Sequence, residues 1–222
     1  SLSNYPARIT PVLSLYRTSV LATELPLAAG CRGGRRVMKS SLPSLDILKH
    51  YFLKPESVQL CILGEGNIND TFLARSTEKN IVLQRINAQV FPFPQRLIHN
   101  LQILSQHLHT TAKPAKQRWQ DVILIPTRTG RPSVQEKDNE LWRALSYIDK
   151  SISVTTLQMP LQATQTGWAL GHFHTKLTGI DLQKLQDPLP GFHHLSSYLN
   201  CYDSLEVTGK TSADIQFCQA LI

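Results

Sequence analysis

The chain has 222 residues, of which 41% are hydrophobic and 18% are charged, a composition typical of a globular protein with a core of its own. No apolar run is long enough to span a bilayer, and the four cysteines are scattered without a CxxC pair, which disfavours a membrane protein, a zinc ribbon and a disulfide framework. The net charge of +7 gives little support to a nucleic-acid partner, because residues 1–37 hold five arginines and one glutamate, 5 − 1 = +4, and the remainder only 7 − 4 = +3.

The first 37 residues show no clear periodicity and end in a glycine and arginine cluster, Gly30 to Arg36. A methionine, Met38, follows at once and precedes a better patterned sequence. Three interpretations stay open: a translated upstream or non-native extension, an arginine-rich transit-type peptide, or a flexible tail. We expect residues 1–37 to be disordered or foreign to the functional protein.

Strands dominate the next hundred residues, with one long helix among them. Ser44 opens a short helix that stops near Pro55. A second helix starts at Pro94 and places four leucines at helical spacing: Leu97, Leu101, Leu104 and Leu108. Alternating and β-branched residues predict strands over residues 58–62, 71–75, 80–86, 121–125 and 140–148, with a turn over residues 127–133.

Helices follow the last predicted strand. The segment from Leu161 to Leu177 is predicted to be helical and to end near Gly179. The last forty residues are predicted to be helical in pieces, with a break from Pro188 to Gly191. We therefore expect two parts, residues 38–150 and residues 151–222.

Two glycines mark the connection between the first two predicted strands. The run from Leu63 to Thr71 contains Gly64 and Gly66, and glycines let a backbone turn sharply and bring its N–H groups close to a polyanion. The Rossmann fingerprint leads into a helix instead, and a Walker A loop ends in Lys-Ser/Thr. Kinase-type folds place such a turn over ATP phosphates. A plain hairpin turn is the alternative, because the sixth position of the kinase pattern is Asn69.

The third predicted strand carries a cation, Arg85, where a kinase-type site places the lysine that reaches the α- and β-phosphates. By the two-residue period of a strand, Leu83 shares its face and is predicted to line an adenine pocket. A surface arginine on an edge strand is the alternative. The helix over residues 94–109 has no acidic residue to pair with this cation, so either another group holds Arg85 or the kinase interpretation fails.

These motifs together resemble the aminoglycoside-phosphotransferase-like kinases and, within that family, most the N-acetylhexosamine 1-kinases. The resemblance runs from about Met38 to the end of the chain and excludes the first 37 residues. It rests on these segments in this order: Gly64–Phe72, Val82–Asn87, Val90–Pro92, Pro126–Gly130, Trp142–Arg143, Tyr147–Ile148, Gly171–His174 and Pro190–His193.

The resemblance implies an α+β, protein-kinase-like bilobal fold: a five-stranded antiparallel N-lobe plus one helix, then the start of a helical C-lobe. It implies ATP with Mg²⁺, and phosphorylation of a small-molecule hydroxyl, with the anomeric hydroxyl of an N-acetylhexosamine as the expected acceptor. The residues that it implies for ATP are Gly64, Gly66, Asn67, Asn69, Thr71, Leu83 and Arg85, with Tyr147 and Ile148 as the hinge. Phe192 and His193 are candidate substrate-side residues, with a simple connector between helices as the alternative.

The chain departs from the family at the catalytic loop. Such kinases carry an aspartate in His-x-Asp-x-x-x-x-Asn and a second aspartate that holds magnesium. Each aspartate after residue 150 lacks that context, namely Asp181, Asp187, Asp203 and Asp214. We assign no catalytic base and no metal ligand, and expect residues 1–222 alone not to turn over. His172 and His174 lie two apart on a helix and make no paired ligand face.

Three functional hypotheses remain. The first is a sugar 1-kinase-like phosphotransferase that stops before its catalytic residues. The second is a kinase of the same fold for homoserine, choline or an aminoglycoside, and the third is a kinase-like remnant that binds nucleotide without turnover. We expect ATP and a small molecule as partners, no nucleic acid or membrane, and a cytoplasmic location, since scattered cysteines fit a reducing compartment. The oligomeric state stays open.

Overall fold

The computed structural model describes residues 42–63, 68–111, 119–136, 140–151, 156–192 and 194–204. The predicted extension over residues 1–37 lies outside these residues. Backbone contacts divide the chain into two compact units, one that ends at Pro188 and one that begins at Leu189. The break predicted from Pro188 to Gly191 falls at this division, whereas the expected boundary at residue 150 stays a prediction.

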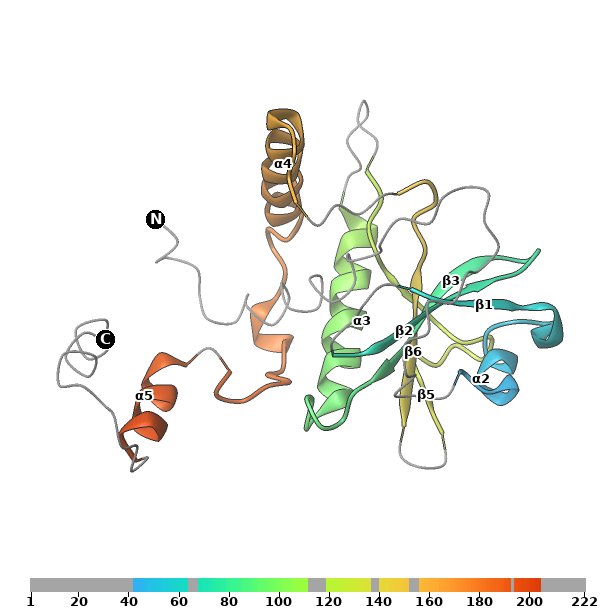
Figure 1. The fold of residues 1–222 in the computed structure, drawn as a ribbon, viewed down its shortest axis with the longest axis horizontal. Coiled ribbons are helices and arrows are strands. Elements are labelled where there is room, and N and C mark those ends of the chain that lie inside the picture. Colours follow the sequence, from blue (N-terminus) through green and yellow to red (C-terminus); the bar gives the residue numbers. More distant parts are fainter. Residues whose placement is uncertain are drawn as a thin grey trace. The chain divides into compact units, whose positions relative to one another are not determined.

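One antiparallel sheet forms the centre of the larger unit (Figure 1). Its strands are β1 (Gln59–Ile62), β2 (Asp70–Arg75), β3 (Asn80–Ile86), β4 (Leu124–Ile125), β5 (Val134–Gln135) and β6 (Leu141–Ser146). They run in the order β1-β2-β3-β6-β4, and β5 pairs with β6. The α+β class and the five predicted strands are confirmed. The sixth, β5, was missed because a two-residue strand beside a turn leaves no alternating pattern.

The first face of the sheet packs against α2 (Leu45–Lys49), which a 3₁₀ turn, η2 (Pro55–Ser57), follows. The Ser44 hydroxyl caps α2 by accepting from the N–H of Ile47, as predicted. Phe72, Leu83 and Ala144 are neighbours in register across β2, β3 and β6 and share the core cluster of this face. We call it the α2 face; α2 and the turn that follows it contribute these buried side chains to the cluster: Ile47, Leu48, Tyr51 and Phe52.

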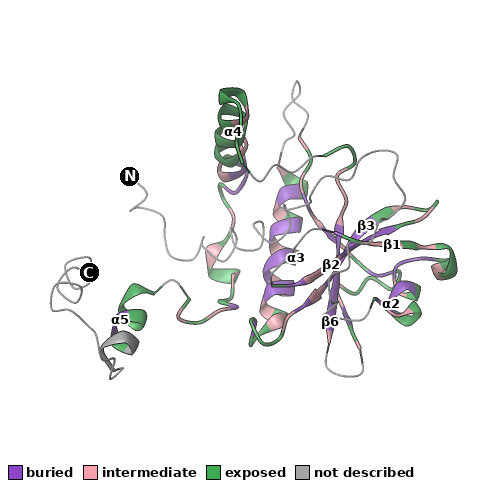
Figure 2. Ribbon diagram, in the orientation of Figure 1, coloured by how far each residue is buried: buried purple, intermediate pink, exposed green. Residues whose placement is uncertain are grey.

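The opposite face packs against α3 (Pro94–Thr110) (Figure 1). The four leucines at helical spacing are buried, so one stripe of α3 is buried along its length (Figure 2). Leu73, Val82 and Leu145 meet this stripe from β2, β3 and β6. We call this side of the sheet the α3 face. Because the side-chain period of a strand is two, the α2 and α3 faces take alternate residues of each strand.

The helix α4 (Pro160–Lys176) attaches to the α3 side through its C-terminal end, where Phe173 and Leu177 join the same core cluster. The predicted helix and its end near Gly179, which has φ of 83°, are confirmed. The short 3₁₀ helix η3 (Leu182–Lys184) follows. Side chains of α3 bind the backbone after α4: the Asn100 amide bonds both the N–H and the C=O of Gln186, at 2.8 and 2.7 Å.

The smaller unit contains α5 (Leu195–Ser204), in which Leu199 is buried. Among the described residues, no helix is both long and apolar enough to cross a membrane.

Glu78 fixes the segment after α2, because its carboxylate accepts from the backbone N–H groups of Leu53 and Lys54, at 3.2 and 3.0 Å. These hydrogen bonds, that of Leu53 first, hold the pKa of Glu78 below its ordinary value. A carboxyl with a lowered folded-state pKa contributes stability above its unfolded pKa, and loses it as the pH falls through the folded pKa.

Replacing Glu78 by glutamine should therefore reduce the free energy of unfolding near neutral pH and have progressively less effect as the pH falls through the titration range of the carboxyl. Urea unfolding across that range measures the difference between the variant and the native chain. A difference that stays constant with pH would contradict the assigned role.

Candidate functional site

The glycine-containing connection joins the paired ends of β1 and β2. Ile62 lies opposite Phe72, and the N–H of Leu63 donates to the carbonyl of Thr71 at 2.9 Å. Gly64, Gly66 and Asn67, which were predicted to contact phosphate, lie outside the described residues. The strand-connection-strand arrangement expected around them is present.

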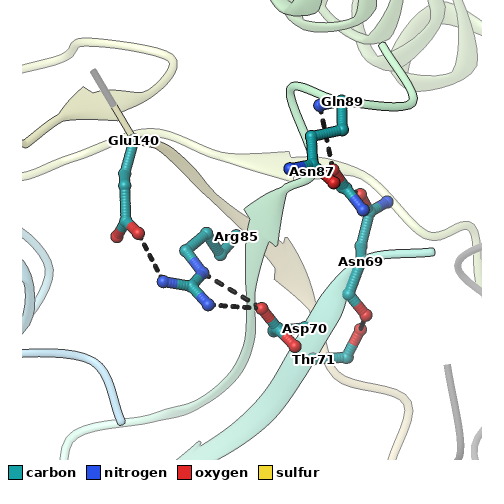
Figure 3. Close-up of polar contacts among 7 residues, drawn as sticks. All are labelled: Asn69, Asp70, Thr71, Arg85, Asn87, Gln89 and Glu140. Atoms are coloured by element: carbon teal, nitrogen blue, oxygen red, sulfur yellow. Dashed lines mark hydrogen bonds and ion pairs between the residues drawn. The ribbon is translucent and has the colours of Figure 1, made fainter. Parts of the chain in front are cut away.

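Asn69 locks the start of β2 to the end of β3 (Figure 3). Its side-chain oxygen accepts from the backbone N–H of Asn87 at 3.0 Å, and the Asn87 side chain in turn accepts from the N–H of Gln89 at 2.9 Å. Asn69 is only 5% exposed, yet its amide nitrogen Nδ2 has no hydrogen-bond partner among the residues that the structure describes. A buried donor without an acceptor is costly, so this nitrogen is a candidate ligand contact.

Arg85 is held between two carboxylates (Figure 3). Its Nη2 and Nε donate to Oδ2 of Asp70 at 2.7 and 3.0 Å, and its Nη1 donates to Glu140. Its guanidinium also lies 5.9 Å from the ring centroid of Trp142. The group that holds Arg85 is thus a pair of acids on β2 and next to β6, not an acid on the helix. Its predicted phosphate role stays a prediction and requires a phosphate to compete with both carboxylates.

Leu83 shares the face of Arg85, as the strand period predicts. That face is the α2 face, where Leu83 is fully buried in the cluster that α2 covers. Its predicted contact with adenine stays a prediction.

A second polar group crosses the sheet on the α3 face. Thr71, Gln84 and Arg143 are neighbours in register on β2, β3 and β6. Arg143 donates from Nε and Nη2 to Oε1 of Gln84 at 3.0 and 2.8 Å. Gln84 Nε2 donates to the Thr71 hydroxyl at 3.1 Å, and that hydroxyl donates to the carbonyl of Asn69 at 3.4 Å. We call these four residues the polar track; it leads from β6 to the glycine-containing connection.

Arg143 is an unusual member of this track because it is 1% exposed and its nearest acceptor is a neutral amide. Among the described residues, no carboxylate lies within ion-pair distance of its guanidinium, and Nη1 has no hydrogen-bond partner. Burial lowers the pKa of Arg143 to about 10, so the side chain still carries its charge at neutral pH.

The predicted hinge lies on the same side as the track. Tyr147 and Ile148 follow β6, are half-buried, and pack against the α3-face cluster that includes Leu63 and Val82. The predicted residues therefore divide between the two faces of one sheet. Asn69, Thr71 and the hinge belong with the α3 face, whereas Leu83 and Arg85 belong with the α2 face.

Of the candidate substrate-side residues, Phe192 is about half exposed in the smaller unit and His193 lies outside the described residues. His172 stacks on Trp168, with ring centroids 4.9 Å apart, and meets Trp119 edge-on at 4.6 Å. In the part of the chain that the structure describes, no group of three His, Cys, Asp or Glu residues could hold a metal ion.

Sequence reasoning missed Gln84 and Arg143 as site residues. A usable signal was the position of Arg143 inside the apolar strand from Leu141 to Ala144, since arginine is rarely fully buried without a partner. For Gln84, the strand period showed only that it faces away from Arg85. Only the tertiary packing shows which face of the sheet α3 covers.

Comparison of the sequence with protein-family models finds no match. Among solved structures, the chain is similar to the spectinomycin phosphotransferase APH(9)-Ia, determined in complex with ADP and spectinomycin. The identity is 15%, the TM-score is 0.41, and the match covers 74% of this chain and 46% of the other. The chain thus spans less than half of that enzyme.

Proposed function

We propose that this chain is the nucleotide-binding part of a kinase-like phosphotransferase. The observation that carries the proposal is the position of the glycine-containing connection, which joins β1 to β2 beside the polar track on β2, β3 and β6. A connection of this kind places backbone N–H groups over a polyanion, and the adjacent strands supply further donors.

In this proposal the phosphates of ATP lie at the connection, against Gly64, Gly66 and Asn67, with Asn69 and Thr71 at its far end. The adenine lies against Tyr147 and Ile148, the two residues directly after β6. Their backbone groups would meet the adenine, and their side chains pack against the α3-face cluster. Apolar walls with a few placed polar groups are the usual composition of a small-molecule site. The half-buried state of this segment supports the assignment.

Mg²⁺ neutralises the developing charge on transferring phosphates in kinases. Among the described residues, no group of His, Cys, Asp and Glu side chains could hold a metal ion. In this proposal Mg²⁺ is therefore carried into the site by ATP, as the MgATP complex. The residues described here bind and orient the nucleotide.

The proposed acceptor is a small-molecule hydroxyl, and the sequence resemblance favours that of an N-acetylhexosamine. An aminoglycoside, homoserine or choline acceptor is compatible with the same fold. Residues 151–222 offer no aspartate in a catalytic-loop context, so we propose that residues 1–222 bind nucleotide without turnover. The cytoplasmic location stays a prediction.

Calorimetric titration of the purified chain with MgATP tests the proposal. The expected result is saturable binding with one site per chain, and no phosphorylated product when each acceptor class is added and the products are analysed by mass spectrometry. Absence of MgATP binding would remove the proposed function. Phosphorylation of an acceptor would overturn the expectation of binding without turnover and would identify the substrate class.

A further inference from the structure

We infer that Arg143, rather than Arg85, is the cation that holds a phosphate group of the bound nucleotide. This inference rests on the proposed function. It moves the phosphate-binding role from Arg85 on β3, where the sequence pattern predicted it, to a residue of β6.

The two arginines differ in how their charge is balanced. Arg85 is neutralised by Asp70 and Glu140, which are 38% and 33% exposed, in an arrangement that is complete without a ligand. Arg143 is enclosed, and its guanidinium donates to the side-chain amide oxygen Oε1 of Gln84. The described residues give this charge no counter-ion, and an enclosed charge without one is costly, so an anion that removes the cost gains binding energy.

The chemistry of the track also favours an anion. At its two ends, Arg143 Nη1 and Asn69 Nδ2 are buried nitrogens that have no partner within the described part of the chain, and both can only donate. Between these residues the hydrogen bonds of the track run from Arg143 Nη2 through the side chains of Gln84 and Thr71 to the backbone carbonyl of Asn69. The two ends lie on β6 and next to the start of β2, strands that β3 separates, so a ligand that satisfies both must offer acceptor oxygens along its length, as the linked phosphates of a nucleotide do and a neutral hydroxyl does not.

The position agrees with the rest of the proposed site. The track lies on the α3 face, on the same side as the hinge residues Tyr147 and Ile148, and it ends at the glycine-containing connection. Arg85 lies on the α2 face, from which the sheet itself separates the hinge cluster. A nucleotide that contacts the hinge and the connection therefore meets Arg143 without crossing the sheet.

The sharpest test is Gln84→Glu, which keeps the shape of the side chain and gives Arg143 an internal carboxylate. We expect the variant to fold with a melting temperature equal to or above that of the native chain. Its dissociation constants for MgATP and for inorganic tripolyphosphate should rise by about 10- to 100-fold, the range for a lost charge-assisted hydrogen bond. The affinity for adenosine, which has no phosphate, should not change.

Arg143→Met should weaken MgATP and tripolyphosphate binding to a similar degree, and Arg143→Lys should recover part of it. Lys49→Met, which removes one positive charge from the exposed side of α2, is the matched control and should bind as the native chain does. Arg85→Met tests the rival assignment directly and should keep its affinity for MgATP.

The outcomes separate the inference from the proposed function. If the native chain does not bind MgATP, the proposed function fails, and this inference fails with it. If the native chain binds MgATP but Gln84→Glu and Arg143→Met bind equally well, the proposed function stands and the inference is wrong. Loss of binding in Arg85→Met alone would assign the phosphate to Arg85 instead.

Discussion

Replacing Lys176 by methionine should lower the free energy of unfolding by about 3–5 kcal/mol, the usual cost of removing one partner of a buried ion pair. The Lys176 ammonium lies 2.7 Å from Oδ2 of Asp121, and the two side chains are 3% and 8% exposed. The other oxygen of Asp121 already accepts from Trp119 Nε1 at 2.8 Å. Without the lysine, Asp121 keeps a buried charge that one neutral donor cannot offset. Urea unfolding measures the loss.

The matched control is the double variant Lys176→Met/Asp121→Leu, which removes both charges. Replacement of a whole buried pair by apolar residues is often close to neutral, so the double variant should recover most of the lost stability. If the single and double variants lose the same amount, the packing of the lysine stem, and not the unpaired aspartate, sets the cost. That result would contradict the view that the ion pair of Lys176 with Asp121 holds the end of α4 to the segment before β4.

Replacing Asn100 by alanine should lower the free energy of unfolding by about 2–4 kcal/mol, because two hydrogen bonds to the backbone of one residue are lost together and a cavity is left. Asn100 is fully buried, and its amide bonds both the C=O and the N–H of Gln186. The same substitution should increase hydrogen exchange in the segment that follows η3, since this amide fixes that segment to α3.

His99→Ala is the control for this prediction. His99 lies one residue earlier on α3, is half-buried, and donates a single hydrogen bond, 3.0 Å long, to the carbonyl of Lys184. A solvent-exposed bond of this kind contributes about 1 kcal/mol or less. Equal losses in the two variants would show that the bidentate contact has no special role in holding the segment.

The sheet and its long helices could be predicted because their signals are local. Leucines at helical spacing with a proline at the first position predicted α3, and alternation with β-branched residues predicted β1, β2 and β3. The last predicted strands were too long: β4 has two residues instead of five, and β6 ends at Ser146 because the chain then leaves the ladder toward the hinge. Strand ends depend on pairing partners, which a single sequence does not display.

The candidate site could be predicted only in part, for a reason of geometry. The two-residue period correctly placed Leu83 and Arg85 on one face, but it could not say which helix covers that face. Packing of α2 on that side puts Leu83 in the core, and the packing of α3 and the hinge segment puts Gln84 and Arg143 on the other side. Arg143 is recognised as a candidate because the described residues around it supply no counter-ion, and this can be seen only once its neighbours in space are known.

Hydrogen exchange of the chain with and without MgATP tests the location of the site most directly. The proposed site predicts slower exchange at three places: the connection between β1 and β2, the ends of β3 and β6 that carry the polar track, and the hinge at Tyr147 and Ile148. Exchange in α2, on the opposite face, should not change. Protection confined to the α2 face, or no protection at a MgATP concentration that saturates binding, would contradict the account.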